Sequence, residues 1–293
     1  MNMQIAGVKF SLSCRQPVTL NDPEQKYRPF FVNTGTAIDS IDINLELKNL
    51  PDTGKMTRIF DSLQSWSLFL DGDDYFFEYK PPSFNEPFWI ARLQSTSERA
   101  TVHCGEALIN RNGCNPAVTN PLCYPLDQLL LMYILARREG GLIHAAGMRL
   151  DNRGFVFPGR SGAGKTTLSR LLLWHNNIGM LSDDRIIIRR IDNAFRIFGT
   201  PWAGEAGIAG NENSPLYGIF FLHHDSGNRI REIKPAAALK KLLPVVSIPW
   251  YDEKTMSDIL FFCGDLVSHV PAYEFYFKPD NEAVHFLEKF ISS

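Results

Sequence analysis

The residue types and spacing that can do chemistry are concentrated in one stretch, Gly159-Arg160-Ser161-Gly162-Ala163-Gly164-Lys165-Thr166-Thr167. It matches the pattern of a phosphate-binding P-loop, G-x-x-x-x-G-K-[ST]. Glycines let the backbone turn its N–H groups toward phosphate oxygens in conformations that a Cβ would forbid. Lys165 would supply a positive charge to the β- and γ-phosphates, and Thr166 a hydroxyl for Mg²⁺. The residues expected to bind the nucleotide are Gly159, Ser161, Gly162, Ala163, Gly164, Lys165, Thr166 and Thr167.

The elements on either side of this stretch support the P-loop interpretation. The apolar run Phe155–Phe157 predicts a strand before the loop, and the leucines of 168–173 predict a helix after it. A glycine-rich turn with an incidental lysine would not need this order of strand, loop and helix. The positive end of the helix would point at the bound anion.

Two adjacent carboxylates follow the predicted helix. The apolar residues 180–182 lead into Asp183 and Asp184, which is the pattern of a Mg²⁺-holding acid downstream of a P-loop. One carboxylate could hold the metal while the other accepts a proton from an attacking hydroxyl. Neighbours in a strand point to opposite faces, so both can serve only if the strand ends here. The alternative is a plain Asp-Asp turn.

A histidine and a glycine-rich loop are further candidates. The predicted strand 142–150 and the turn 151–154 make His144 part of a hairpin with the P-loop strand. Its imidazole then either lies near the phosphates or is a satisfied core residue. The loop 199–207 contains Glu205 and is either a lid, an acceptor-binding element or a surface turn. His223-His224-Asp225 is interpreted as a solvated turn rather than a metal site.

The sequence predicts two domains in a mixed α/β fold. Residues 1–120 are expected to form a small β-rich domain, since apolar and polar residues alternate repeatedly there, with a hairpin across 66–79. Proline-rich residues 115–125 are expected to connect it to a P-loop domain over 121–293. In the second domain we expect helices at 126–139, 235–243 and 281–291, and Gly140-Gly141 is expected to end the first of them. We also expect a hairpin of 185–191 with 194–198 and strands at 217–223, 261–262 and 273–277.

Composition restricts the class of protein. With 293 residues and a net charge of −2, we expect no general role on nucleic acids or membrane surfaces. No basic, apolar leader is recognised, and the longest apolar run, 129–136, is too short to span a bilayer. Five cysteines without close CxxC pairs favour reduced thiols in the cytoplasm. A zinc site on His103, Cys104, Cys114 and Cys123 is the alternative, although structural zinc ligands usually come in close pairs.

Four features in order resemble the catalytic domain of the HPr serine kinase/phosphorylase family. They are the segment Leu142–Gly147 (LIHAAG), the P-loop 159–167, the segment Leu181–Asp184 (LSDD) and the loop 199–207, and the resemblance covers roughly residues 125–290. That family shares its nucleotide-binding fold with ATP-dependent phosphoenolpyruvate carboxykinase. With its β-rich N-terminal part, the whole chain looks like the HPr-kinase-like proteins of bacteria.

The resemblance implies a role for each candidate residue. His144 would lie near the transferred phosphate, Asp183 would be the base for a serine hydroxyl and Asp184 would join Thr166 at the metal, although the two aspartates could exchange roles. With Lys165, Glu205 completes the catalytic set, as a match to the acidic residue of a second signature loop. The phosphorylase signature loop is not found, so the reverse reaction is not implied. The N-terminal region does not match that of the HPr enzymes, so HPr need not be the acceptor.

The sequence therefore predicts a cytoplasmic kinase that uses ATP and Mg²⁺ to phosphorylate a hydroxyl, most simply serine, on a protein, peptide or small molecule. Self-association into a homo-oligomer is an option that the sequence leaves open. Two alternatives compete with the kinase. One is a non-catalytic regulator in which ATP sets a conformation. The other is a carboxykinase, although the chain is short for that and has no obvious basic cluster for a dicarboxylate beside the P-loop.

Overall fold

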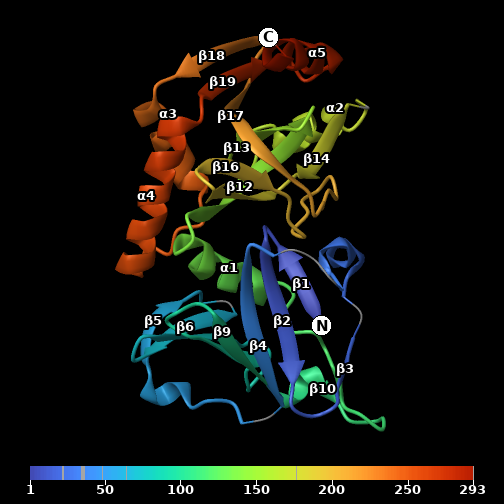
Figure 1. The fold of residues 1–293 in the computed structure, drawn as a ribbon, viewed down its shortest axis with the longest axis vertical. Coiled ribbons are helices and arrows are strands. Elements are labelled where there is room, and N and C mark those ends of the chain that lie inside the picture. Colours follow the sequence, from blue (N-terminus) through green and yellow to red (C-terminus); the bar gives the residue numbers. More distant parts are fainter. Residues whose placement is uncertain (22, 34–36, 48, 64, 176, 293) are drawn as a thin grey trace. The chain divides into compact units, whose positions relative to one another are not determined.

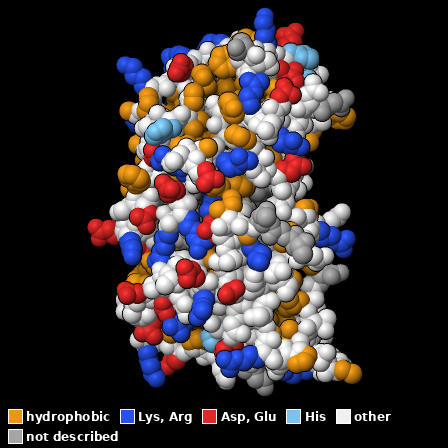
Figure 2. Space-filling view, in the orientation of Figure 1, with side chains coloured by type: hydrophobic (Ala, Val, Ile, Leu, Met, Phe, Trp, Pro, Cys, Tyr) orange, Lys and Arg blue, Asp and Glu red, His pale blue; other side chains and the backbone are white. Residues whose placement is uncertain are grey.

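The computed structural model describes residues 1–21, 23–33, 37–47, 49–63, 65–175 and 177–292 and has a mixed α/β fold (Figure 1). Contacts divide the chain into two compact units, Met1–Ile134 and Leu135–Ser293. Basic and acidic side chains are interspersed over the face that Figure 2 draws, as the net charge of −2 suggests. Among the described residues, no helix combines the length and apolar character that a membrane span requires.

The first unit is built on an eight-stranded mixed sheet. In it, β4 (Asp39–Leu47) pairs in parallel with both β2 (Val8–Cys14) and β9 (Arg99–Cys104), and the other pairs of neighbouring strands are antiparallel. The predicted hairpin across residues 66–79 is confirmed. The order of the strands is β1 (Asn2–Ile5), β2 (Val8–Cys14), β4 (Asp39–Leu47), β9 (Arg99–Cys104), β8 (Trp89–Leu93), β7 (Asp74–Tyr79), β6 (Trp66–Asp71) and β5 (Thr57–Asp61).

The proline-rich segment 115–125 differs from the expected linker. It contributes β11 (Ala117–Val118) to a small sheet with β10 (Ile109–Asn110) and β3 (Thr19–Leu20), so it belongs to the first unit. Four 3₁₀ helices complete the described elements, at Gln25–Phe30, Thr53–Lys55, Glu106–Leu108 and Leu243–Val245.

Helix α1 (Leu126–Ala136) ends before the predicted residue 139, and the expected cap at Gly140-Gly141 is wrong. Both glycines begin strand β12 (Gly140–Leu150) instead, after Glu139 takes a left-handed conformation with φ 47°. At both positions a neighbouring side chain packs so closely on the backbone that there is little room for a Cβ. A Cβ on Gly140 would lie 3.0 Å from Arg189 Cγ, and one on Gly141 3.0 Å from Phe262 Cε1.

The second unit is organised by two long strands, β12 (Gly140–Leu150) and β17 (Asn213–His224). Each pairs with different neighbours along its length, so they join two groups of strands into one sheet. The turns Asp151-Asn152 and Asp192-Asn193 have positive φ at both residues, as tight two-residue hairpins require. The remaining strands are β13 (Arg153–Pro158), β14 (Ile178–Ser182), β15 (Arg185–Ile191), β16 (Ala194–Phe198), β18 (Arg229–Ile233) and β19 (Ala272–Phe277).

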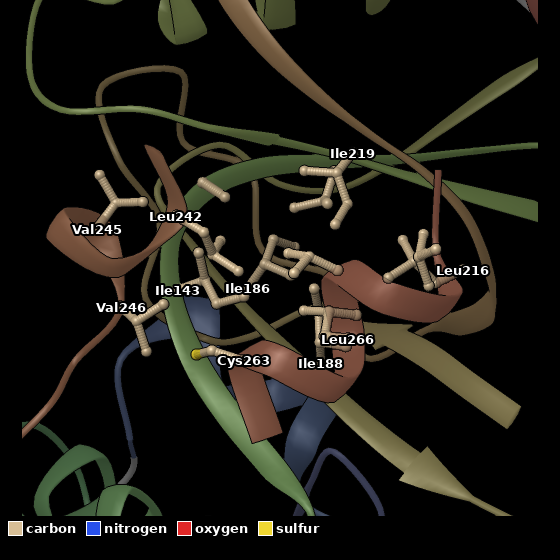
Figure 3. Close-up of a cluster of buried hydrophobic side chains, with 14 of the residues drawn as sticks. Ile143, Ile186, Ile188, Leu216, Ile219, Leu242, Val245, Val246, Cys263 and Leu266 are labelled. Carbon is tan, nitrogen blue, oxygen red and sulfur yellow. The ribbon is translucent and has the colours of Figure 1, made fainter. Parts of the chain in front are cut away.

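A hydrophobic cluster lies on each face of the central strands. Alternation along β13 places Val156 in one cluster and Phe155 and Phe157 in the other. The first cluster is covered by α3 (Pro235–Leu242) and α4 (Glu253–His269), and Figure 3 shows their side chains meeting those of β12, β15 and β17. The second is covered by α2 (Lys165–Leu172) and α5 (Asn281–Ser292). Helix α2 is therefore anchored by its own buried leucines.

The predicted strand at Phe261-Phe262 is wrong, because both residues lie inside α4. The side chain of Asp252 caps this helix by accepting a hydrogen bond from the N–H of Thr255 at 3.2 Å. The buried residues Ile259, Phe262, Cys263 and Leu266 follow helical spacing, whereas Phe261 is 75% exposed. Two adjacent phenylalanines are too short a window to distinguish the two periods.

The buried carboxylate of Glu274 should make the folding stability of the second unit fall in acid. Glu274 is 5% exposed. Burial alone would raise the pKa of Glu274, but hydrogen bonds from Lys241, Arg231 and Tyr276 outweigh it and lower the pKa to about 2. Because the folded pKa lies below the ordinary value of 4.5, its stabilisation is present above that pH and is lost as pH falls toward 2.

We expect Glu274→Gln to reduce the free energy of unfolding at pH 7 by on the order of 3 kcal/mol. Each unit of difference between the pKa of Glu274 in the folded and in the unfolded chain corresponds to about 1.4 kcal/mol. Urea unfolding at pH 7 and pH 3 measures this, and the difference from wild type should shrink at pH 3. Glu232→Gln, an exposed change on β18, is the matched control. An equal effect of the two substitutions would contradict the prediction.

Candidate functional site

The predicted P-loop lies between the end of β13 and the start of α2, which confirms the expected strand, loop and helix. Gly162 and Gly164 have φ of 83° and 96°, in the left-handed region that favours glycine. A Cβ on Gly159 would lie only 2.7 Å from Ala163 Cβ. The loop is thus shaped by all three glycines, and it ends at the free N–H groups of a helix N-terminus.

Lys165 is the first residue of α2 and is 7% exposed. Its Nζ donates hydrogen bonds to the carbonyl oxygens of Gly159, at 2.7 Å, and Arg160, at 3.2 Å. Burial lowers the pKa of Lys165, and the negative charge of Asp184 acts in the opposite direction. The amine is therefore held against the loop, beside a carboxylate.

His144 lies next to the loop because β12 pairs with β13. Ala145 is opposite Pro158, and the N–H of Gly159 donates to the carbonyl of His144 at 3.1 Å. The imidazole Nε2 is 3.0 Å from Asp184 Oδ1. The His144 side chain is 23% exposed, so it is a partly exposed group with a carboxylate partner and not an enclosed core residue.

Asp184 faces the same space as His144. The hydrogen bond with His144 lowers the pKa of Asp184, and the positive charges of Arg185 and Lys165 act in the same direction against burial. Its side chain is 34% exposed. The result is an ionised, partly open carboxylate whose Oδ1 is paired with an imidazole.

Asp183 differs sharply from its neighbour. It is 3% exposed, and its carboxylate accepts three backbone hydrogen bonds, from the N–H groups of Gly204 (2.9 Å), Ala206 (2.7 Å) and Ile208 (3.1 Å). Strand β14 ends at Ser182, so the chain turns here and both carboxylates can border one cavity. Asp183 fastens the loop 199–210 to the end of β14.

The loop itself is held at further points. The N–H of Gly210 donates to the carbonyl of Leu181 at 3.0 Å, and the N–H of Gly199 donates to the carbonyl of Glu212 at 3.0 Å. Glu205 has an exposed side chain at the edge of the cavity. The loop therefore presents one carboxylate to solvent beside the phosphate loop.

The backbone of the loop 199–210 packs tightly against both aspartates at Gly204. A Cβ at Gly204 would lie 2.9 Å from Asp183 Oδ2 and 2.9 Å from Asp184 Cβ. Since the hydrogen bonds of the loop hold Asp183 in place, Gly204→Ala should cost roughly 1–3 kcal/mol of stability. Thermal unfolding measures this. Gly227→Ala, where a Cβ would meet nothing within 4 Å, is the matched control, and equal melting temperatures for the two variants would refute the packing argument.

One cavity of about 670 Å³ gathers most of the predicted residues. Of the residues predicted from the sequence, Gly159 and Ala163 are not among its lining residues, and Gly159 contributes its carbonyl to Lys165 instead. The lining residues are His144, Ser161, Gly162, Gly164, Lys165, Thr166, Thr167, Asp183, Asp184, Gly204, Glu205 and His224.

His224 borders this cavity, whereas the sequence predicted a solvated turn at this position. It is the last residue of β17, which is parallel to β13, so both strands end at the same edge of the sheet. A Cβ on Gly164 would lie 3.1 Å from His224 Cε1. Asp225 follows the strand, before the bend at Ser226 and Gly227, and its carboxylate pairs with Arg229 at 2.7 Å. Knowing the strand pairing would have identified His224.

The alternative zinc site is wrong. Among the described residues, no group of three or more metal-ligating side chains includes His103, Cys104, Cys114 or Cys123. Cys104 is fully buried and Cys114 is exposed, while His103 Nδ1 lies 3.4 Å from Glu46 Oε2.

No family model matches this chain, and no curated protein matches it either. A functional assignment therefore rests on the geometry of the cavity.

Proposed function

We propose that this chain is an ATP- and Mg²⁺-dependent kinase that transfers a phosphoryl group to a hydroxyl, most simply the serine hydroxyl of a protein, a peptide or a small molecule. The observation that carries the proposal is the convergence on one cavity of the phosphate loop, Lys165, both aspartates and His144. The second unit would then be a P-loop domain of the type that HPr kinase shares with phosphoenolpyruvate carboxykinase.

The residues present fit a nucleotide with its metal. Gly162 and Gly164 hold the loop in a cradle that side chains would strain, and the N-terminus of α2 opens onto the cavity. A volume of about 670 Å³ lies within the usual range of small-molecule sites, about 300–1,000 Å³. Thr166 and Asp184 both line the cavity, and their oxygens are ligands that Mg²⁺ prefers.

The chain's residues would act mainly by binding and orienting. Bound Mg-ATP supplies the phosphoryl group and neutralises charge on the phosphate oxygens. Lys165 and the loop amides hold the phosphates, and Thr166 and Asp184 hold the metal. Glu205, which is exposed and lines the cavity, would contact the acceptor. Catalysis of this kind depends on positioning and on electrostatic stabilisation.

For the proton of the acceptor hydroxyl, the geometry favours His144 over Asp183. Asp183 accepts three backbone hydrogen bonds from the loop 199–210, so most of the acceptor capacity of its two oxygens is used to hold that loop. His144 can donate Nε2–H to Asp184 and keep Nδ1 as a lone-pair acceptor. A base oriented by a carboxylate is a common arrangement. In this proposal, Asp184 orients His144 and binds the metal together with Thr166, while Asp183 positions the loop 199–210.

Transfer from labelled ATP in the presence of Mg²⁺ tests the proposal, with free serine, serine peptides, HPr and a cell lysate as acceptors. Label on an acceptor that is lost in both Lys165→Ala and Asp184→Asn supports a kinase. Tight ATP binding without transfer to any acceptor would contradict the proposal and favour the nucleotide-dependent regulator. Oxaloacetate-dependent release of CO₂ would favour a carboxykinase.

A further inference from the structure

A second cluster of metal-ligating side chains lies away from the phosphate cavity. His175 follows the C-terminal end of α2, whereas Lys165 begins that helix. His285 and Glu288 are three residues apart on α5, so they share one face of the helix. We propose that His175, His285 and Glu288 form a Zn²⁺ site that ties α2 to α5. The site goes beyond the proposed kinase function and does not depend on it.

The distances between the donor atoms suit a tetrahedral zinc ion. His175 Nδ1 lies 3.6 Å from Glu288 Oε1, and His285 Nδ1 lies 3.6 Å from Glu288 Oε2. All three ligand atoms lie within 4.8 Å of one another. Ligands at about 2.0–2.1 Å from a tetrahedral zinc are separated from each other by about 3.3 Å. Small side-chain movements would therefore bring the three donors to bonding distance.

The environment also suits a metal. The side chains of His175 and Glu288 are 17% and 25% exposed, whereas His285 is 70% exposed, which leaves an entry path. In the described part of the chain, the ion pairs of Glu288 are with these two imidazoles. Two imidazoles and one carboxylate are a donor set that zinc uses, with a fourth position for water.

The position of His175 is defined by the end of α2. Its N–H donates to the carbonyl of Leu172 at 3.1 Å, which holds the chain close to the helix. Helices α2 and α5 also share a hydrophobic cluster through Leu168, Leu172, Val284 and Leu287. Since binding to the folded chain raises its stability, zinc should raise the melting temperature of the protein.

Calorimetric titration of ZnCl₂ into the full chain tests this site. The protein is first cleared of metal with a chelator and is then kept in excess Mg²⁺, which occupies the acidic phosphate cavity. We expect His285→Gln and Glu288→Gln each to weaken the zinc affinity by at least about 100-fold, because loss of even an outer partner of a ligand costs about 10–100-fold. The matched control is His269→Gln, a half-exposed histidine on α4 with no place in the cluster. It should bind zinc as the wild type does.

Two further measurements distinguish zinc bound at the proposed site from zinc bound by cysteine thiols. Co²⁺ in place of zinc should give visible absorption without a thiolate charge-transfer band, and zinc should raise the melting temperature of the wild type but not of His285→Gln. Because His285 is exposed, this variant should fold. Unchanged zinc affinity in both ligand variants, or a thiolate band that marks cysteine ligands, would overturn the proposal.

Discussion

Replacing Lys165 by alanine is expected to lower phosphoryl transfer by about 10²–10³-fold, the usual cost of removing one group that stabilises developing charge in an enclosed site. The amine is 7% exposed and lies against the carbonyls of Gly159 and Arg160. Because Lys165 is buried, its charge should act on phosphates more strongly than that of an ammonium in water. ATP binding should weaken as well, because the same charge attracts the ground state.

Initial rates with labelled ATP and calorimetric ATP titration measure the two effects. Lys240→Ala, which removes an exposed lysine on α3, is the matched control and should change neither. Lys165→Arg should not restore the rate, because a planar guanidinium differs in shape and hydration from a compact ammonium. Full transfer by Lys165→Ala would remove the basis for treating this loop as the phosphate site.

Local signals in the sequence were sufficient for much of the second unit. The spacing of Gly159, Gly164 and Lys165 located the loop, and the polar pairs Asp151-Asn152 and Asp192-Asn193 located two hairpin turns. These features depend on residues close together in the chain, where conformational preferences act directly. The predicted hairpin between β12 and β13 is confirmed, and it places His144 beside the loop, one of the two alternatives that the sequence left open for this residue.

Contacts between distant segments were beyond local reasoning. His224 reaches the cavity because β17 runs parallel to β13, and no short pattern encodes that pairing. Phe261 and Phe262 lie in a helix whose period is visible only over the length of α4. The partners of Asp183 lie 21 to 25 residues later, on the loop 199–210. The sequence therefore identified both aspartates but had no means of dividing their roles.

The division of roles between the aspartates predicts two distinct mutant phenotypes. Asp184→Asn should lower the rate of transfer by about 10²–10⁴-fold, as expected when a proton-transfer arrangement is broken. Its 34%-exposed side chain can be changed at little cost in stability. Asp183→Asn should instead destabilise the protein, since an amide NH₂ would replace one of the oxygens that accept the N–H groups of Gly204, Ala206 and Ile208.

Each buried donor left without a partner costs about 1–3 kcal/mol, and each kcal/mol lowers the melting temperature by roughly 2–4 °C in a domain of this size. Thermal unfolding, amide hydrogen exchange over residues 204–208 and initial rates, measured on both variants, separate the phenotypes. A stable Asp183→Asn protein with a protected loop and no transfer would return the base to Asp183. A destabilised, fast-exchanging Asp183→Asn beside a stable, inactive Asp184→Asn is the result we expect, because Asp183 accepts hydrogen bonds from the loop whereas Asp184 is paired with His144.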